Sequence, residues 1–224
     1  MKRSEVNAQV RWAKELLESA HFRLPDMAYW TMDEYRRHRE DLRDVRTLML
    51  GWDITDFGTD DYEKTGAVLY TVRNGSLVTP EIGVPYCEKL ILMHPGQRLP
   101  CHYHVYKTED IICRAFGPLE IRLWNTDESG KAMETPVQFV MDGMHRTVEA
   151  GEPFRITVGN SVTLTPGMAH IFGPAGGNPV VAGEVSRVND DTTDNYFLEK
   201  TARFAEIEED EEMLVPLCNE YDRV

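Results

Sequence analysis

The fold is decided by residues 95–110, which read Pro95-Gly96-Gln97-Arg98-Leu99-Pro100-Cys101-His102-Tyr103-His104-Val105-Tyr106-Lys107-Thr108-Glu109-Asp110. His102 and His104 are one residue apart, so an extended strand would place both imidazoles on the same face. A short turn after His104 could return the carboxylate of Glu109 to that face. Two imidazoles and a carboxylate suit a divalent transition metal that keeps open coordination positions. The stretch therefore predicts a metal site on a β-strand, with a further ligand from elsewhere in the chain.

Short apolar or alternating runs surround this stretch and are typical of β-strands. The runs are residues 47–50, 67–72, 87–93, 119–124, 137–141, 147–150, 154–158, 161–165, 170–173 and 180–188. Asn74-Gly75 and Asp142-Gly143, which lie between runs, are typical of hairpin turns. Many short strands separated by Gly and Pro favour an antiparallel barrel or sandwich.

The first 45 residues have a helical pattern instead. Apolar residues recur at helical spacing from Val6 to Leu17, which predicts a helix over 3–20. The capping-box spacing from Thr31 to Glu34 predicts a second helix from 31 to 43. The expected organisation is one domain over 1–224. It comprises a helical N-terminal extension (1–45), a β-barrel core (46–190) and a C-terminal extension (191–224) with a short acidic tail.

Composition limits the partners and the compartment. The formal net charge of −14 argues against nucleic acid or an anionic membrane surface as a partner. No stretch has the length of a membrane span, and the start of the chain lacks the apolar run of a signal peptide. The four cysteines show no paired spacing and no CxxC motif, as is typical of free thiols in a reducing cytosol. We therefore expect a cytoplasmic protein.

A second motif supplies a candidate for the missing ligand. Gly159 is followed, after five residues, by Thr165-Pro166-Gly167-Met168-Ala169-His170. Together with Gly96, His102, His104 and Glu109, this motif resembles the two motifs of the cupin superfamily, which are small β-barrels that hold a metal with three histidines and a glutamate. The resemblance implies an all-β fold, a jelly-roll-like antiparallel barrel with the N-terminal helices packed outside. It also implies a set of metal ligands: His102, His104, Glu109 and His170.

The match departs from the cupin pattern at three positions. Thr165 stands where a proline is usual two places before the final glycine of the second motif, and Pro174 stands where an asparagine usually closes that motif. Gly117, which closes the first motif, comes one residue late. None of these differences removes a ligand.

Two further stretches resemble a narrower family. In residues 102–114 a lysine, Lys107, lies between two predicted metal ligands, and residues 183–199 are followed by Arg203-Phe204. With the helical N-terminus and the chain length, these stretches look like the D-lyxose isomerases, which are metal-dependent cupin sugar isomerases. The resemblance spans nearly the whole chain and is firmest between residues 86 and 204.

The resemblance implies an aldose–ketose isomerase that interconverts D-lyxose and D-xylulose, and also D-mannose and D-fructose. The reaction would be proton transfer through a metal-stabilised cis-enediol. It would use one divalent metal per chain, Mn²⁺ first, with Co²⁺, Zn²⁺, Fe²⁺ or Ni²⁺ also compatible with imidazole and carboxylate ligands. A monosaccharide substrate and a homodimer are implied as well.

The reaction needs a carboxylate outside the ligand set to carry a proton between two carbons. In the family a glutamate shortly before the Arg-Phe pair has an acid/base role, and Glu199 is the residue that matches. Lys107 is its expected partner, a cation that could polarise the carbonyl or move a proton between sugar oxygens. We expect burial beside a divalent cation to depress the pKa of Lys107.

Candidates for substrate contact lie around the last predicted strand. Glu184 could face inward and accept a hydrogen bond from a histidine N–H. Arg187, Asp190 and Asp191 would lie at the strand end, where a barrel mouth places contacts with sugar hydroxyls. Phe172, two residues after His170, could wall the pocket or pack in the core.

Two other functions could use the same ligands. An iron-dependent cupin dioxygenase needs neither Lys107 nor a separate base, and a non-catalytic sugar-binding cupin needs no base at all. A sensor would ordinarily carry a DNA-binding segment, whereas the N-terminal helices are balanced in charge. Arg98, Arg114 and Arg155 leave a phosphorylated sugar open as the substrate.

Overall fold

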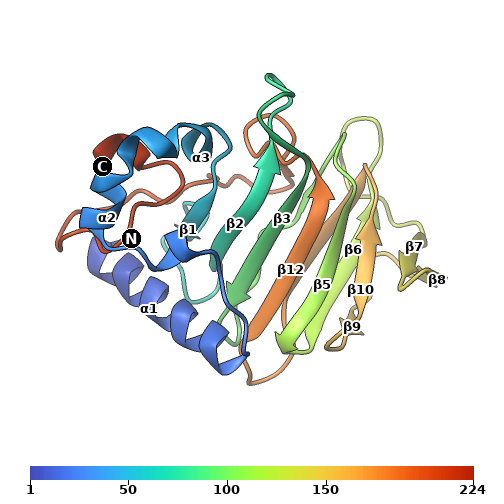
Figure 1. Ribbon diagram of the computed structural model, residues 1–224. Helices are drawn as coiled ribbons and strands as arrows, with labels where there is room; N and C mark the ends of the chain where they lie inside the picture. The colour runs from blue at the N-terminus through green and yellow to red at the C-terminus, as the bar shows by residue number, and fades with distance from the viewer.

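Two antiparallel β-sheets face each other in the computed structural model, which describes residues 1–224 (Figure 1). The larger sheet has the order β1-β2-β3-β12-β5-β10-β7-β8, and the smaller has the order β13-β4-β11-β6-β9. The strands are β1 (Gly51–Thr55), β2 (Ala67–Gly75), β3 (Gly83–Met93), β4 (His102–Tyr103), β5 (Glu109–Phe116), β6 (Leu119–Asn125), β7 (Val137–Met141), β8 (Met144–Val148), β9 (Phe154–Ile156), β10 (Ser161–Leu164), β11 (Met168–Pro174), β12 (Val180–Arg187) and β13 (Tyr196–Phe197). The all-β, cupin-like barrel expected from the sequence is confirmed.

The larger sheet separates two hydrophobic cores, because side chains alternate between its faces. In β3, Ile91 and Met93 belong to the core between the two sheets, whereas Leu90 and Leu92 belong to the core under the helices. The near-continuous apolar run of β3 follows from this burial on both faces.

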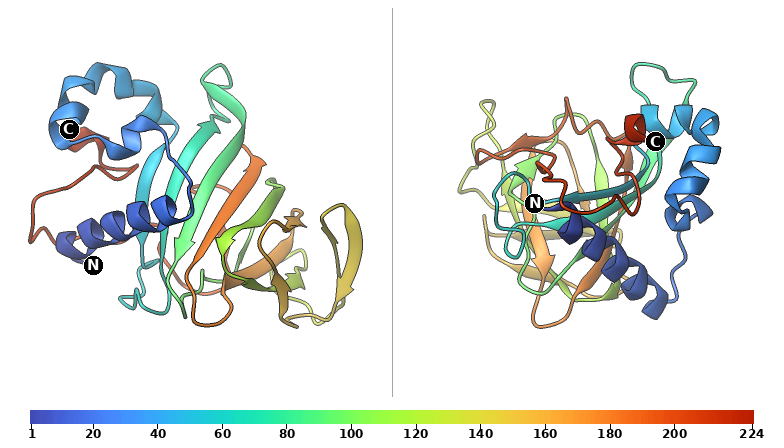
Figure 2. Two further views of the ribbon diagram at one scale, coloured as in Figure 1. Left: turned by 60° about the horizontal axis from the view of Figure 1, so that its bottom comes forward. Right: turned by 90° about the vertical axis from the view of Figure 1, so that its left-hand side faces the viewer.

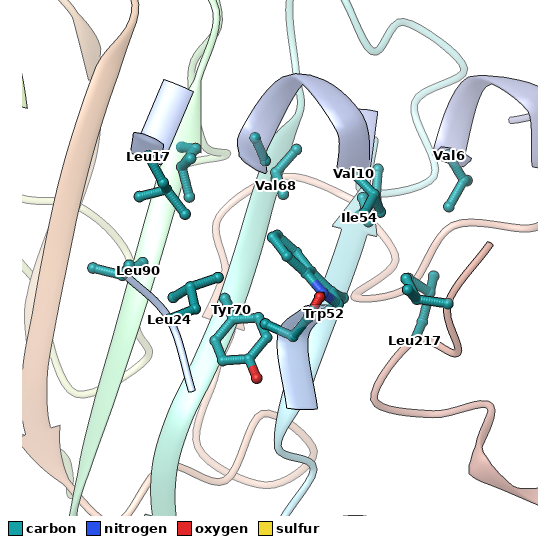
Figure 3. Close-up of a cluster of buried hydrophobic side chains, with 14 of the residues drawn as sticks. Val6, Val10, Leu17, Leu24, Trp52, Ile54, Val68, Tyr70, Leu90 and Leu217 are labelled. Atoms are coloured by element: carbon teal, nitrogen blue, oxygen red, sulfur yellow. The ribbon is translucent and has the colours of Figure 1, made fainter. Parts of the chain in front are cut away.

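The helices cover the outer face of β1, β2 and β3 (Figure 1). They are α1 (Arg3–Ser19), η1 (Asp26–Tyr29), α2 (Met32–Arg37), η2 (Arg39–Leu42), α3 (Arg43–Thr47) and, near the C-terminus, η3 (Tyr221–Arg223). Val10 and Leu17 of α1 lie over Trp52 and Tyr70 of the sheet (Figure 3). None of these helices combines the length and the apolar character that crossing a bilayer requires.

The second predicted helix is interrupted. Thr31 forms the expected capping box, in which its hydroxyl accepts from the Glu34 N–H at 3.3 Å and its own N–H donates to the Glu34 carboxylate at 2.7 Å. The helix α2 nevertheless ends at Arg37, because His38 leaves the helical conformation and stacks its ring on Trp30. The chain then continues as η2 and α3, so the run 47–50 is not a strand, and β1 begins only at Gly51.

The C-terminal segment lies against α1 and forms part of the helical core (Figure 2). Arg3 is fully buried, and its guanidinium binds the carboxylates of Glu209, at 2.8 Å, and Glu220. Val215 and Leu217 are buried in the same core as the apolar face of α1. The acidic end of the chain is therefore anchored by the first helix.

Candidate metal centre

The four predicted metal ligands converge between the two sheets. His102, His104, Glu109 and His170 are all buried, and one candidate ligand atom from each lies within 4.8 Å of the others. His102 on β4 is directly paired with His170 on β11, while Glu109 begins β5 in the opposite sheet. The cupin pairing of two remote motifs therefore brings four donors to one point.

Backbone carbonyls orient the three imidazoles. The Nδ1 atoms of His102 and His170 lie 2.9 Å and 3.1 Å from the carbonyl oxygen two residues earlier, and Nδ1 of His104 contacts the carbonyl of Asp194. Since a carbonyl can only accept, each Nδ1 carries the proton and each Nε2 has a free lone pair. The burial of His102 and His170 lowers their pKa, which favours the neutral imidazole.

These lone pairs fit a divalent cation. Nε2 of His104, Nε2 of His170 and Oε1 of Glu109 are buried without a hydrogen-bond partner. Oε1 of Glu109 lies 3.4 Å from the first nitrogen and 3.2 Å from the second. Acceptors that face one another are costly to bury, and a cation would satisfy all of them. Imidazole nitrogens and a carboxylate are ligands that a divalent transition metal accepts.

Lys107 lies between two carboxylates beside this cluster. Its Nζ is 2.8 Å from Oε2 of Glu109, 2.9 Å from Oε1 of Glu184 and 2.9 Å from Oδ1 of Asn189. Burial lowers the pKa of Lys107, but Glu109 and Glu184 raise it more, so the pKa lies above its ordinary value. The protein's own charges therefore favour the ammonium form of Lys107, whereas the depressed pKa expected from the sequence depends on a divalent cation beside it.

Glu184 faces the interior from β12 and contacts cations, not histidines. Its carboxylate accepts from Lys107 and from the Ser186 hydroxyl at 3.2 Å, and lies 3.6 Å from Nζ of Lys89. Burial raises the pKa of Glu184, but Lys107 and Lys89 lower it more, so it is a carboxylate at neutral pH. The expected hydrogen bond from a histidine N–H is absent, because backbone carbonyls occupy every Nδ1 proton.

Asp191 is the other predicted substrate contact that reaches the cavity beside the histidines. Its carboxylate accepts from Arg203 at 2.8 Å and lies 4.0 Å from Nζ of Lys89. Burial raises the pKa of Asp191, whereas Arg203 and Lys89 lower it more, to well below its usual range. Phe172 does not line this cavity, because it is buried in the barrel core with its ring stacked behind His170.

Three predicted residues lie outside the cavity. Arg187 is exposed, since the alternation along β12 that turns Glu184 inward turns Arg187 outward. Asp190 accepts hydrogen bonds from Thr192 and Thr193 in the following turn. Glu199 is exposed and lines a groove on the outside of β4 and β13, so the structure does not bring it to the four ligands.

A line of buried charges leading away from Glu184 was missed from the sequence. Lys89 is 3% exposed and approaches both Glu184 and Asp191, and Arg203 joins Asp191 to Asp53 at 2.6 Å. A signal for Lys89 was present, because strand alternation places it on the same face as Ile91 and Met93. Asp53 and Arg203 come from segments 150 residues apart, so no local pattern could show that they pair.

Asp194 was also missed, although it fixes the loop between His104 and Glu109, which carries Lys107. Its carboxylate accepts from the backbone N–H groups of Val105 at 2.6 Å, Tyr106 at 3.1 Å and Lys107 at 2.8 Å. Its own carbonyl orients His104. Because its partners lie 87 to 89 residues earlier in the chain, no local pattern could reveal this role.

The cavity beside the histidines is narrow and has two unlike walls. Its volume is about 30 Å³, roughly that of one water molecule. Lys89, Lys107 and Glu184 form a charged wall, and Phe57 and Phe197 form an aromatic one. Asn195 and Phe197 also border a larger outer groove of about 770 Å³. These two residues therefore form the partition between the cavity and the groove.

A family model and two relatives match this chain over nearly its whole length. Residues 1–221 match the family model described as D-lyxose isomerase. The chain is 39% identical over 225 residues to a D-lyxose/D-mannose isomerase of Serratia proteamaculans, covering 100% of this chain and 99% of that relative. It is 36% identical over 223 residues to a D-lyxose/D-mannose isomerase of Escherichia coli O157:H7, covering 99% and 98%.

Solved structures give a similar picture of the fold. An L-ribose isomerase of Geodermatophilus obscurus superposes with a TM-score of 0.60 at 17% identity, covering 93% of this chain and 98% of that one. An L-ribose isomerase of Acinetobacter sp. DL28, solved in complex with L-ribose, gives a TM-score of 0.57 at 18% identity with the same coverage. At this identity the similarity shows a shared cupin-like fold.

Proposed function

The chain belongs to the D-lyxose isomerase family and is a sugar isomerase, and we propose that it interconverts D-lyxose with D-xylulose and D-mannose with D-fructose. The names of the two relatives support these substrates, because both are D-lyxose/D-mannose isomerases that match over almost their full length.

The observation that carries this proposal is the contact between the ligand cluster and a buried acid–base pair. Glu109 directs Oε1 toward the histidines and Oε2 toward Lys107, which in turn binds Glu184. His102, His104, Glu109 and His170 would hold the divalent cation, manganese in our proposal. When bound, this ion supplies a Lewis acid that favours negative charge on neighbouring sugar oxygens.

Glu184 is our proposal for the residue that moves the carbon-bound proton. Conversion of an aldose to a ketose requires that one proton leaves C2 and one arrives at C1. A buried, ionised carboxylate can take the first proton and return it to C1. Its ionised state and its position in the cavity wall support this role. Glu199 stays a prediction for the same role, but it is exposed outside the cavity.

We propose that Lys107 transfers protons to and from the sugar oxygens. The oxygen on C1 must gain a proton and the oxygen on C2 must lose one in the same conversion. An ammonium held among three acceptors can give a proton to one oxygen and recover one from the other. Its raised pKa supports the protonated form as the resting state.

The test is conversion of free aldoses by metal-depleted and metal-restored protein. We expect chelator-treated protein supplied with Mn²⁺ to convert D-lyxose to D-xylulose and D-mannose to D-fructose. The conversion should be the same in air and without oxygen, which distinguishes an isomerase from a dioxygenase. Chelator-treated protein without added metal should convert neither sugar. If the manganese-loaded protein leaves both sugars unchanged, the proposed activity is wrong.

We also propose a cytoplasmic homodimer. Exposed apolar side chains near one end of the barrel support self-association: Tyr86, Val105, Tyr106 and Val185. Sedimentation equilibrium should give twice the 25.7 kDa chain mass, and a monomer at micromolar concentration would contradict the dimer.

The state of the cysteines supports the cytoplasmic location. The four cysteines form no disulfide, and burial raises the pKa of Cys87 and Cys101 to about 12, as suits unreactive thiols.

A further inference from the structure

Asn195 borders the metal cavity and carries an unpaired polar atom. The residue lines the cavity together with His102, His104 and Lys107. Its carboxamide oxygen is buried and has no hydrogen-bond partner. Among the residues that line this cavity, the other buried polar side-chain atom without a partner is Nε2 of His104, which faces the ligand cluster.

The protein's own groups leave this amide unsatisfied. A buried polar group without a partner costs about 1–3 kcal/mol, and native proteins contain few of them. The three cations that line the cavity all lie against carboxylates. Lys107 binds Glu109 and Glu184, Arg203 binds Asp191, and Nζ of Lys89 lies 3.6 Å from Glu184. The missing partner is therefore a water molecule or a ligand in the cavity, and a ligand hydroxyl can take the place of the water.

A hydroxyl group matches this need. It can donate and accept, so it satisfies whichever end of the carboxamide faces the cavity. The aromatic wall of Phe57 and Phe197 has no polar atom to offer, and Phe197 lies two residues beyond Asn195. A polyhydroxylated ligand would thus find one uncharged amide among lining residues that are otherwise charged, apolar or predicted metal ligands.

The backbone around Asn195 is fixed on both sides. Asp194 binds three consecutive N–H groups at residues 105–107 and orients His104. Tyr196 pairs with Tyr103 in the β-ladder, and the two rings stack with centroids 5.3 Å apart. These contacts hold Asn195 in a set position relative to the ligands, and such preorganisation favours selective binding.

We propose that Asn195 is a specificity-determining residue whose carboxamide hydrogen-bonds a hydroxyl group on a sugar carbon beyond C2. The inference rests on the proposed function, since its ligand is the aldose. The oxygens on C1 and C2 take part in the reaction. A hydroxyl on C3 or C4 is unchanged by it, and its direction differs between aldoses of different configuration. An aldose that lacks this hydroxyl leaves the amide unpaired and binds more weakly.

The test compares D-lyxose with its 3-deoxy and 4-deoxy analogues on manganese-loaded wild type and Asn195→Ala. For D-lyxose we expect the substitution to raise KM about 10- to 100-fold with a smaller change in kcat, as loss of one buried hydrogen bond predicts. One of the two deoxy sugars lacks the hydroxyl that Asn195 binds, and for this sugar wild type and variant should have the same KM. Bound manganese should not change, and Tm should not fall, because the amide has no partner within the protein.

A matched control is Thr201→Val, which removes another buried, unpaired oxygen that borders the outer groove but not the cavity. This variant should keep the wild-type KM. An unchanged KM in Asn195→Ala, or an equal loss for D-lyxose and both analogues, would overturn the proposal. If the wild type converts no aldose, the proposed function fails separately. In that case, calorimetric titration of wild type and Asn195→Ala with D-lyxose tests the role of Asn195 by itself. Equal Kd values for the two proteins, or no binding to either, would overturn this role.

Discussion

Glu109 uses its two carboxylate oxygens for different partners. Oε1 faces His104 and His170, and Oε2 binds the ammonium of Lys107. Burial raises the pKa of Glu109, but Lys107 and His104 lower it more, so it stays ionised as a metal ligand must. One residue thereby joins the metal centre to the residues that we propose handle protons.

Glu184→Gln should lower kcat for D-lyxose by about 100- to 10,000-fold, because an amide cannot take the proton that general-base catalysis requires. Bound manganese should stay at the wild-type level, since Glu184 is not one of the four ligands. Steady-state kinetics and metal analysis of one preparation measure both quantities.

Glu199→Gln is the matched control for this prediction and should retain most of the wild-type kcat. The opposite pattern, with activity lost in Glu199→Gln and kept in Glu184→Gln, would assign the base to Glu199.

Individual site residues differ in how far the sequence could predict them. The four ligands have fixed spacings within two motifs, so the sequence alone indicates them. Lys89 was signalled only by strand alternation, and Asp194 acts through loop contacts with residues 105–107. The prediction of Glu199 rests on its place before Arg203-Phe204, and this place says nothing about the direction of the side chain.

At the level of elements, α1 and the C-terminal segment form one paired unit outside the barrel. Arg3 has no exposed surface and binds both Glu209 and Glu220, while Ser4 binds Asp210 through its backbone and its hydroxyl. The acidic run at 206–212 is therefore in part neutralised by the first turn of α1.

Arg3→Ala should lower the free energy of unfolding by about 1–3 kcal/mol, because it removes the buried cation between Glu220 and the half-exposed Glu209 and leaves Arg223 as their remaining cationic partner. Urea denaturation monitored by circular dichroism measures this change. Arg11→Ala is the control, since Arg11 is exposed on the same helix, and it should stay within about 0.5 kcal/mol of wild type. Equal stabilities for the two variants would show that the buried ion pair does not anchor the C-terminal segment.

The same contact predicts a pH dependence. Hydrogen bonds from Arg3 and Arg223 lower the pKa of Glu209 from 4.5 to about 2. A carboxyl group whose pKa is depressed by folding stabilises the protein above its unfolded pKa, and this stabilisation is lost as the pH falls through the folded pKa. Wild type should therefore exceed Glu209→Gln in unfolding free energy above about pH 4.5, and the difference should shrink between pH 4.5 and 2.

Glu212→Gln is the control for this experiment, because Glu212 is exposed in the same acidic run. Its stability should follow that of wild type at every pH. A difference between wild type and Glu209→Gln that persists unchanged down to pH 2 would contradict the depressed pKa.

The elements were predictable where local chemistry decides them. Asp142-Gly143 forms the expected two-residue turn between β7 and β8, with positive φ at both residues. Asn74-Gly75 does not form a turn, because β2 continues to Gly75, which pairs with Gly83. The side chain of Asn74 instead binds the backbone of Asn189, a contact that no local pattern could show.

On the scale of the whole molecule, the metal centre lies between the two sheets. The helices lie outside the barrel (Figures 1 and 2). The period-two runs and the paired motifs predicted the barrel and the site within it. The second core could not be predicted, because it requires that β1, β2 and β3 be buried on both faces and that the C-terminal segment return to α1. Such packing depends on tertiary contacts, which a single sequence does not display.

The metal centre is tested most directly by titrating Mn²⁺ into chelator-treated protein while bound manganese and D-xylulose formation from D-lyxose are measured in the same samples. One ion per chain should bind, activity should rise in proportion to bound ion, and both should reach a plateau at one equivalent. His102→Ala, which lacks one donor, should show weaker binding and little activity. Conversion of D-lyxose by metal-free protein, or full stoichiometric binding and activity in His102→Ala, would contradict a catalytic metal held by His102, His104, Glu109 and His170.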